Sequence, residues 1–171
     1  MVYLRTPRRA DQVELLTRVA ASRALHRPWV KPPADAESFA SYLKRCARPD
    51  FCGQLVCRNE DDAVVGVFNL SQIFLGPFCS AYLSYYAFTP FAGCGYMTQG
   101  MRLMLHHAFT RLQLHRVEAN LQPDNHASRA LVQRCGFVQE GFSPRYLKIG
   151  GRWRDHERWA LLIESWRKSA G

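Results

Sequence analysis

Short runs rich in β-branched and aromatic residues recur along the chain, and turn-forming residues separate them. These runs predict strands at residues 2–5, 52–58, 64–74, 80–88, 117–121, 138–149 and 153–163. Gly150 and Gly151 stand between the last two runs and are typical of a hairpin turn. The last two strands should therefore pair with each other.

Apolar residues at helical spacing predict helices between these strands. The predicted helices cover residues 11–24, about 35 to 45, 96–112 and about 124 to 134. Asp35 or Ser38 can cap the second helix, and Gly136 ends the last one. This order predicts a mixed α/β fold with a largely antiparallel sheet, and the absence of a linker predicts a single domain over residues 1–171.

Composition and charge narrow the class of protein. Of the 171 residues, 47% are hydrophobic and 22% are charged, which is typical of a globular domain with a buried core. A net charge of +9 favours polyanionic partners, such as a phosphorylated cofactor, RNA or an RNA-rich assembly, although charge also serves solubility alone. No apolar run approaches the roughly 18 residues of a membrane span, and no secretory signal is apparent. We therefore expect a cytoplasmic protein with no membrane partner.

Cysteine and histidine spacing argues against a metal site. None of the six cysteines forms a C-x-x-C pair, and no Cys/His cluster has the spacing of zinc ligands. The pair His106-His107 and the single His115 belong to different predicted elements and have no carboxylate partner nearby in the sequence. Reduced, packed cysteines and no bound metal are expected.

The loop Gly93-Cys94-Gly95 joins a predicted strand to a predicted helix. Glycines let backbone N–H groups turn toward a ligand, and a helix N-terminus adds positive potential, so such a loop can cradle a pyrophosphate. A simple turn explains the two glycines equally well. The loop lacks the third glycine of a dinucleotide-binding fold and the Gly-Lys-Ser/Thr of a nucleotide P-loop.

The segment from Pro123 to Ser128 marks the start of the last predicted helix. Asn125 and Ser128 are three residues apart, so both project from its first turn. Helix capping by Asp124 or Asn125 explains one of these polar residues. It explains Ser128 less well, because Ser128 already lies inside the first turn.

The order of these motifs resembles the GNAT N-acetyltransferase superfamily: Gly93-x-Gly95 after a strand, Asn125-x-x-Ser128, Gly136-Phe137 and Glu140-Gly141. Further blocks are similar to the RimJ branch, whose members acetylate N-terminal residues of ribosomal proteins. These blocks are Arg27-Pro28-Trp29, Asn69-Leu70-Ser71, Tyr82-Leu83-Ser84-Tyr85, His115-Arg116-Val117, Ala119-Asn120 and Trp153-Arg154-Asp155-His156. The resemblance implies a GNAT fold, with a mixed, mostly antiparallel sheet of about seven strands and about four helices.

The resemblance also implies that acetyl-CoA is the cofactor and which residues hold it. The cofactor-binding residues would be Tyr86, Ala87, Phe88, Gly93, Cys94, Gly95, Tyr96, Met97, Thr98, Asn125 and Ser128. The chain departs from the superfamily at three positions. Pro90 replaces a frequent Gln or Arg, Gln99 replaces a frequent Glu, and Val132 stands where several enzymes have a Tyr as thiolate acid. The departures at Pro90 and Gln99 would lower acyl-CoA affinity without removing the backbone cradle, and Val132 leaves Ser128 as the better candidate for the thiolate acid.

The implied reaction is direct acetyl transfer to an amine, with a protein N-terminus as the leading acceptor. An α-amine has a pKa of about 7.7–8.0 and a lysine amine about 10.4, so only a weak base is needed for an N-terminus. Ser128 is expected to donate a proton to the leaving thiolate. Glu118 is expected to act as the base, directly or through water, although an ordinary strand carboxylate explains it as well. His156 and Tyr85 are weaker candidates for the base.

The acceptor groove is expected to have aromatic and basic walls. Its substrate-binding residues would be Trp29, Phe74, Tyr85, Tyr146 and Trp153. Such walls suit the N-terminus of a protein, in particular a ribosomal protein, with contact between the basic surface and ribosomal RNA. The alternatives are an enzyme for a small amine (an amino acid, a polyamine or a drug) and a non-catalytic module that binds acyl-CoA or the ribosome. A monomer and a homodimer both remain open.

Overall fold

The computed structural model describes residues 1–170, without the side chains of residues 169 and 170, and places seven strands in one sheet. Their order is β1-β2-β3-β4-β5-β7-β6, and every neighbouring pair is antiparallel except β4 with β5. The strands are β1 (Val2–Arg5), β2 (Phe51–Arg58), β3 (Val64–Phe74), β4 (Ser80–Ala87), β5 (Arg116–Leu121), β6 (Val138–Ile149) and β7 (Arg152–Leu162). The mixed, mostly antiparallel sheet expected from the sequence is confirmed.

Six α-helices and one 3₁₀ turn accompany the sheet, so the expected number of about four helices was too low. They are η1 (Arg9–Asp11), α1 (Gln12–Ala21), α2 (Arg23–His26), α3 (Ala36–Cys46), α4 (Tyr96–Thr110), α5 (His126–Arg134) and α6 (Ile163–Ala170). The helix predicted at 11–24 breaks at Ser22, whose hydroxyl accepts the Thr89 N–H at 3.0 Å. The other addition is α6, which begins where the last predicted strand was expected to end. No helix within residues 1–170 has both the length and the apolar character needed to cross a membrane.

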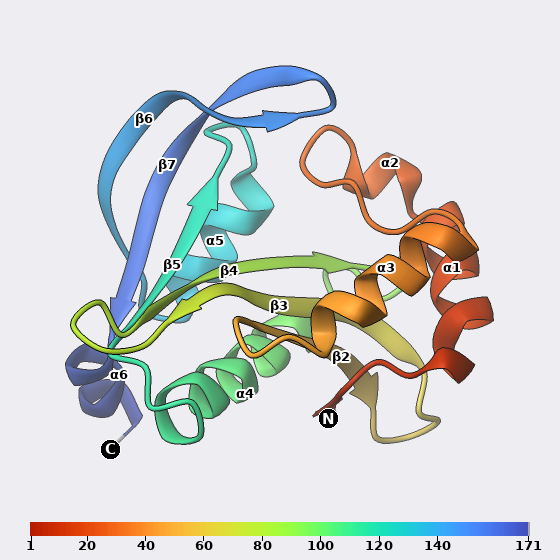
Figure 1. Ribbon diagram of the computed structural model, residues 1–171, viewed down its shortest axis with the longest axis horizontal. Helices are drawn as coiled ribbons and strands as arrows, with labels where there is room; N and C mark the ends of the chain where they lie inside the picture. The colour runs from red at the N-terminus through yellow and green to blue at the C-terminus, as the bar shows by residue number, and fades with distance from the viewer. Residues whose placement is uncertain (171) are drawn as a thin grey trace.

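Both faces of the sheet are covered, which explains why the middle strands have nearly continuous apolar runs. Met101, Met104 and Leu105 of α4 are buried with residues of α5 in the core on one face. Leu15 of α1 and Phe39 of α3 are buried in a separate core on the other face. Figure 1 shows α4 below the sheet and α1 and α3 on its other side.

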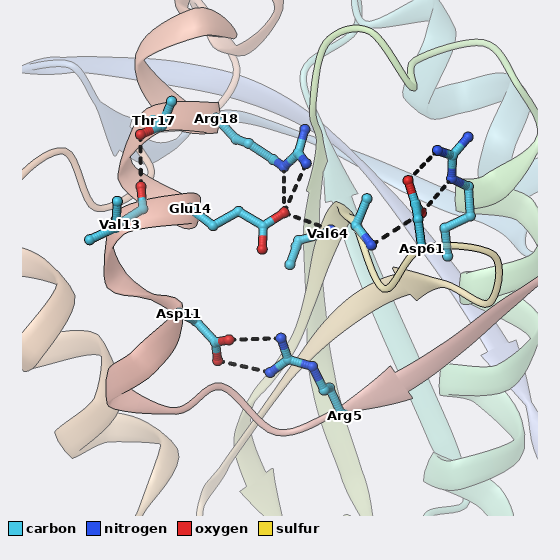
Figure 2. Close-up of polar contacts among 10 residues, drawn as sticks. Arg5, Asp11, Val13, Glu14, Thr17, Arg18, Asp61 and Val64 are labelled. Atoms are coloured by element: carbon cyan, nitrogen blue, oxygen red, sulfur yellow. Dashed lines mark hydrogen bonds and ion pairs between the residues drawn. The ribbon is translucent and has the colours of Figure 1, made fainter.

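Polar contacts attach the N-terminal segment to the sheet (Figure 2). The Arg5 guanidinium donates to both carboxylate oxygens of Asp11, at 2.8 and 2.7 Å. The Glu14 carboxylate accepts the Val64 N–H at 3.1 Å and the Arg18 Nε–H at 2.9 Å. These bonds fix α1 over β3, and the helices that follow it are thereby held beside the end of β4.

Candidate active site

The two parallel strands at the centre of the sheet separate part-way along their length. Their ladder joins Ser80 with Arg116, Ala81 with Val117 and Tyr82 with Glu118. Beyond these pairs β4 and β5 diverge, as Figure 1 shows. The second half of β4 therefore borders a gap instead of a neighbouring strand.

The backbone of β4 presents alternate peptide groups to this gap. Phe88 N–H donates to Val65 O at 2.9 Å, so this N–H faces β3, whereas the Phe88 carbonyl accepts the Phe91 N–H in the turn that follows. In an antiparallel ladder the hydrogen-bonding direction alternates from one residue to the next. The peptide groups of Tyr86 therefore also face β3, and those of Tyr85 and Ala87 face the gap. An extended amide-containing ligand can pair with the groups of Tyr85 and Ala87 as an added strand would.

His26, from the short helix α2, closes one end of the gap. Its Nε2 lies 2.8 Å from the carbonyl oxygen of Ala87, and since a carbonyl only accepts, Nε2 must carry the proton. Burial lowers the pKa of His26, although the bond to Ala87 partly opposes this, so the ring is neutral near pH 7. In that tautomer Nδ1 is an acceptor, and it is buried without a hydrogen-bond partner.

The glycine loop at the start of α4 adopts a backbone conformation that favours glycine. Gly93 and Gly95 have φ of +81° and +82°, and a Cβ at either position would meet nothing within 4 Å. Gly95 is the N-cap of α4, whose first turn has no acidic residue, so the helix N-terminus is electropositive. Arg134 of α5 adds a positive charge nearby, where its Nη1 donates to Thr98 Oγ1 at 3.3 Å. This arrangement suits a phosphorylated ligand.

The first turn of α5 projects polar groups into the gap from the opposite side. The Asn125 Oδ1 caps the helix by accepting the Ser128 N–H at 3.1 Å. The Ser128 Oγ lies 2.6 Å from the Tyr85 Oη of β4. Burial raises the pKa of Tyr85, so its hydroxyl keeps its proton at neutral pH. Arg129 anchors the same turn through Glu157 of β7, with an Nη2 to Oε1 distance of 2.6 Å.

Two cavities open along this gap. The loop-side cavity, of about 380 Å³, is bounded by the glycine loop, α2 and α5, and its wall includes His26 and Arg134. The hairpin-side cavity, of about 360 Å³, lies between residues 29–31 and residues 147–150 of the β6–β7 hairpin, which reaches over the gap in Figure 1. The walls of both cavities include Trp29, Val30, Tyr85, Asn125 and Ser128. The hydroxyl pair of Tyr85 and Ser128 therefore lies at the junction of the two cavities.

The Acetyltransferase (GNAT) domain family matches this chain over residues 2–138. The chain belongs to the GNAT acetyltransferase family. The resemblance inferred from the glycine loop and the Asn125-x-x-Ser128 motif is thereby confirmed.

Relatives of this GNAT protein carry several names. The ribosomal protein uS5-alanine N-acetyltransferase of Escherichia coli (strain K12) is 34% identical over 107 residues, which are 63% of this chain and 55% of that enzyme. The chain thus spans little more than half the length of this curated relative. RimJ of Mycobacterium smegmatis, solved in complex with CoA-disulfide, has a TM-score of 0.87 at 30% identity, over 95% of this chain and 82% of that one. Spermidine N-acetyltransferase of Vibrio cholerae, in complex with CoA and spermine, shares the fold at a TM-score of 0.83 and 21% identity, over 97% and 98% of the two chains.

Most of the residues expected at the site are brought together by the fold. Those in the cavity walls are Trp29, Tyr85, Tyr86, Ala87, Gly93, Gly95, Met97, Thr98, Asn125 and Ser128. Others lie outside the walls. Phe88 is fully buried in the core shared with α1 and α3, Cys94 is exposed, and the Tyr96 ring packs edge-on against Phe91.

Three residues expected in the acceptor groove also lie outside the two walls. Phe74 and Trp153 are 59% and 60% exposed, because each sits at or near the tip of a hairpin. Tyr146 packs behind the cavity wall, with its ring centroid 6.0 Å from that of His156. Aromatic character alone did not separate wall residues from surface residues.

Glu118, the expected base, is engaged elsewhere. Its Oε1 accepts the Arg116 Nε–H at 2.7 Å, and Arg116 also pairs with Glu140. Glu118 belongs to the part of β5 that is still paired with β4 and lies outside both cavity walls. Because side chains alternate along a strand, Glu118 lies on the same sheet face as Asn120, but two residues further along β5 from the gap.

His156 of β7, a weaker candidate in the sequence, lies in the wall of the hairpin-side cavity. Its Nδ1–H donates to Arg154 O at 2.9 Å, so Nε2 is the acceptor in the neutral ring. Burial lowers the pKa of His156, against smaller effects of Arg154 and Asp155. The ring is therefore neutral near pH 7 and able to accept a proton.

Several wall residues were not assigned to the site from the sequence. His26, Asn120, Gln122 and Arg134 were not expected at the site, and Asn120 Oδ1 is buried without a hydrogen-bond partner. The alternation of β5 could have placed Asn120 on the sheet face opposite the α4 core, but not beside a cavity. Within residues 1–170, no group of three His, Cys, Asp or Glu side chains could hold a metal ion, and the expectation of no metal remains a prediction.

Proposed function

We propose that this GNAT protein transfers the acetyl group of acetyl-CoA to the N-terminal α-amine of a protein, with a ribosomal protein as the leading acceptor. The observation that carries the proposal is the junction of two cavities at Tyr85, Asn125 and Ser128. One cavity has the groups that a phosphorylated, amide-containing cofactor requires, and the other is free for an amine. The E. coli relative whose name specifies a ribosomal protein alanine supports the choice of acceptor.

The loop-side cavity fits coenzyme A in three respects. The Gly93–Gly95 loop, which has open space beside both glycines, and the α4 N-terminus suit the pyrophosphate. Arg134 supplies a positive charge in the same cavity, which Pro90, at the position of a frequent Gln or Arg, cannot supply. The peptide groups of Tyr85 and Ala87 can pair with the pantetheine amides. The buried Nδ1 of His26 lacks a donor, which a ligand N–H would supply. When bound, acetyl-CoA supplies an acetyl group activated as a thioester.

The hairpin-side cavity supplies what an amine needs. His156 Nε2 can accept a proton from the attacking amine, directly or through water. Asn120 Oδ1, buried without a partner, can accept an N–H of the acceptor. Ser84 and Gln122 in the same wall add groups that hydrogen-bond to peptide amides, which favours a peptide over a small amine.

Ser128 and Tyr85 supply the proton that the leaving thiolate needs. When the Tyr85 Oη–H donates to Ser128 Oγ, 2.6 Å away, the Ser128 hydroxyl is free to donate a proton to the sulfur of the leaving thiolate. The N-terminus of α5 stabilises negative charge that develops beside Ser128. This pair takes the place of the Tyr that several family members have at the position of Val132. The net charge of +9 suits an acceptor on an RNA-rich particle, contact with its RNA, and a cytoplasmic site of action.

The proposal is tested by incubating the purified protein with acetyl-CoA and peptides beginning with Ala, Ser, Thr, Met or Gly. Thiol release is followed and the products are analysed by mass spectrometry, with Nα-blocked peptides that contain lysine as the control. We expect one acetyl group on the α-amine and a preference for small first residues. If acetyl-CoA binds but only small amines react, the acceptor is a small molecule. If acetyl-CoA does not bind, the protein is not an acetyltransferase of this kind.

A further inference from the structure

The charges around the hairpin-side cavity are all of one sign. Lys31, from the loop after α2, and Lys148, near the end of β6, contribute to its wall. The residues lining this cavity include no Asp or Glu within the described part of the chain. His156, the remaining titratable group with a basic side chain, is neutral near pH 7 because burial lowers its pKa.

The two lysines enter from opposite sides of the cavity and are exposed. Lys148 takes part in no ion pair among residues 1–170. The pKa of Asp35 is lowered chiefly by hydrogen bonds from Ser38, and the charge of Lys31 contributes only a small part of this effect. The positive charge of the wall is therefore largely uncompensated within the chain.

Arg154 adds to this charge from beneath the hairpin. Its Cα pairs with that of Leu147, a wall residue, so the two side chains share one face of the hairpin with His156. Arg154 Nε is buried without a hydrogen-bond partner. Arg154 is not among the residues that line the cavity, so its charge acts on a bound acceptor only through the wall.

Two carboxylates near the hairpin, Asp155 and Glu118, accept hydrogen bonds from other residues. Asp155 accepts the Arg145 N–H at 2.7 Å, and Glu118 accepts from Arg116 at 2.7 Å. Neither carboxylate belongs to the cavity wall. Asp155 acts electrostatically on His156 of the wall, but the charged residues that line the cavity itself are Lys31 and Lys148.

We infer that the acceptor is a polypeptide N-terminus with Asp or Glu among the residues that follow its free amine, and that polyamines are rejected. This inference rests on the proposed function, since it describes the acceptor of the same site. The amine lies at the junction by Tyr85 and Ser128, and the following residues extend between Lys31 and Lys148. A polyamine would bring further positive charges to this wall, and like charges placed together oppose binding.

The inference is tested with three peptides that share a first alanine and differ only at residues two to four: Glu-Glu-Glu, Gln-Gln-Gln or Lys-Lys-Lys. Wild-type protein should acetylate the acidic peptide with a kcat/KM about tenfold above that of the neutral one, and the basic peptide should be slower still. The preference should shrink at high salt, because screening weakens exposed charge interactions. Spermidine should not be acetylated measurably.

Lys148→Glu should abolish or reverse the preference for the acidic peptide. Lys44→Glu makes the same charge change on α3, away from both cavity walls, and should leave the preference intact. Equal rates for the three peptides, or faster acetylation of spermidine, would overturn the inference while leaving an active acetyltransferase. If none of the peptides reacts, the proposed function itself fails and the inference fails with it.

Discussion

The Tyr85 hydroxyl lies 2.6 Å from the Ser128 hydroxyl, across the gap that opens where β4 and β5 diverge. Either hydroxyl can donate this hydrogen bond; when Tyr85 donates it, the Ser128 proton is free to point into the junction of the two cavities. Ser128 also lies in the first turn of α5, held by Asn125 Oδ1. The pair thus combines a protonated donor with a helix N-terminus at the place where a leaving thiolate needs both.

Replacing Ser128 should affect turnover more than cofactor binding. We expect Ser128→Ala to lower kcat by about a hundredfold, because one positioned donor contributes roughly 2–4 kcal/mol at the transition state. The acetyl-CoA Kd, measured by calorimetry, should stay within about twofold, since the cofactor is held mainly by backbone groups. Tyr85→Phe should lower kcat less than Ser128→Ala does. The double variant should lose less transition-state stabilisation than the two single variants added together, because the two hydroxyl groups act as a unit. An unchanged kcat in Ser128→Ala would remove Ser128 from the mechanism.

The pH dependence of kcat/KM should distinguish His156 from Glu118. Two groups must lose a proton in the wild type: the acceptor amine, with a pKa of about 7.7–8.0, and His156, whose pKa is lowered from its ordinary value. The acid limb of log(kcat/KM) should therefore steepen toward a slope of two. His156→Gln, which can still donate to Arg154 O, should leave a slope of one and a rate about a hundredfold lower.

Glu118→Gln is the comparison for this experiment. Because Glu118 is paired with Arg116 and lies outside the cavity walls, the variant should keep the steep acid limb and most of the rate. If the acid limb of log(kcat/KM) flattens in Glu118→Gln and not in His156→Gln, Glu118 is the base.

The free energy of unfolding should decline as the pH falls below the pKa of a free histidine. The pKa values of His26, His107 and His156 are lowered, chiefly by burial, so the unfolded chain binds more protons than the native one at mildly acidic pH. Their contribution is fully present above the unfolded pKa of about 6.5 and is lost as the pH falls through it toward the native values. The Tm should be a few degrees lower at pH 5.5 than at pH 7.5.

His26→Gln keeps a donor for Ala87 O and removes the titration, so it should flatten part of this dependence. His126→Gln changes an exposed histidine and should leave the slope unchanged. The same pH slope in both variants would show that His26 does not contribute.

Two glycines with the same backbone conformation should separate strain from cofactor binding. Gly95 in the α4 loop has φ +82° and Gly76 in the β3–β4 turn has φ +79°, and a Cβ at either meets nothing within 4 Å. Alanine at either position should cost about 1–2 kcal/mol of stability, because left-handed backbone is unfavourable for L-residues. Only Gly95→Ala should also weaken acetyl-CoA binding, by about tenfold or more, since its methyl group enters the space of the ligand. Equal affinity in both variants would argue against the glycine loop as the cofactor cradle.

Local patterns in the sequence determined the strands and the chemistry of the two site motifs. Alternating and continuous apolar runs predicted all seven strands, because a strand face that is buried carries apolar side chains at a regular spacing. Gly93 and Gly95 signalled the loop, since few other residues accept φ near +80°. Asn125 and Ser128 were recognisable because three residues make nearly one helical turn.

Only the tertiary structure decided which side chains meet. Tyr85 and Ser128 are 43 residues apart, and His26 and Ala87 are 61 apart. The helix break at Ser22 depends on the distant Thr89 N–H, and Arg116, which pairs with Glu118 on its own strand, also pairs with the distant Glu140. Periodicity reports the environment of one element at a time. The divergence of β4 from β5, the side on which α5 packs and the hairpin reaching over the gap depend on how all the elements pack together, and that packing decided the site.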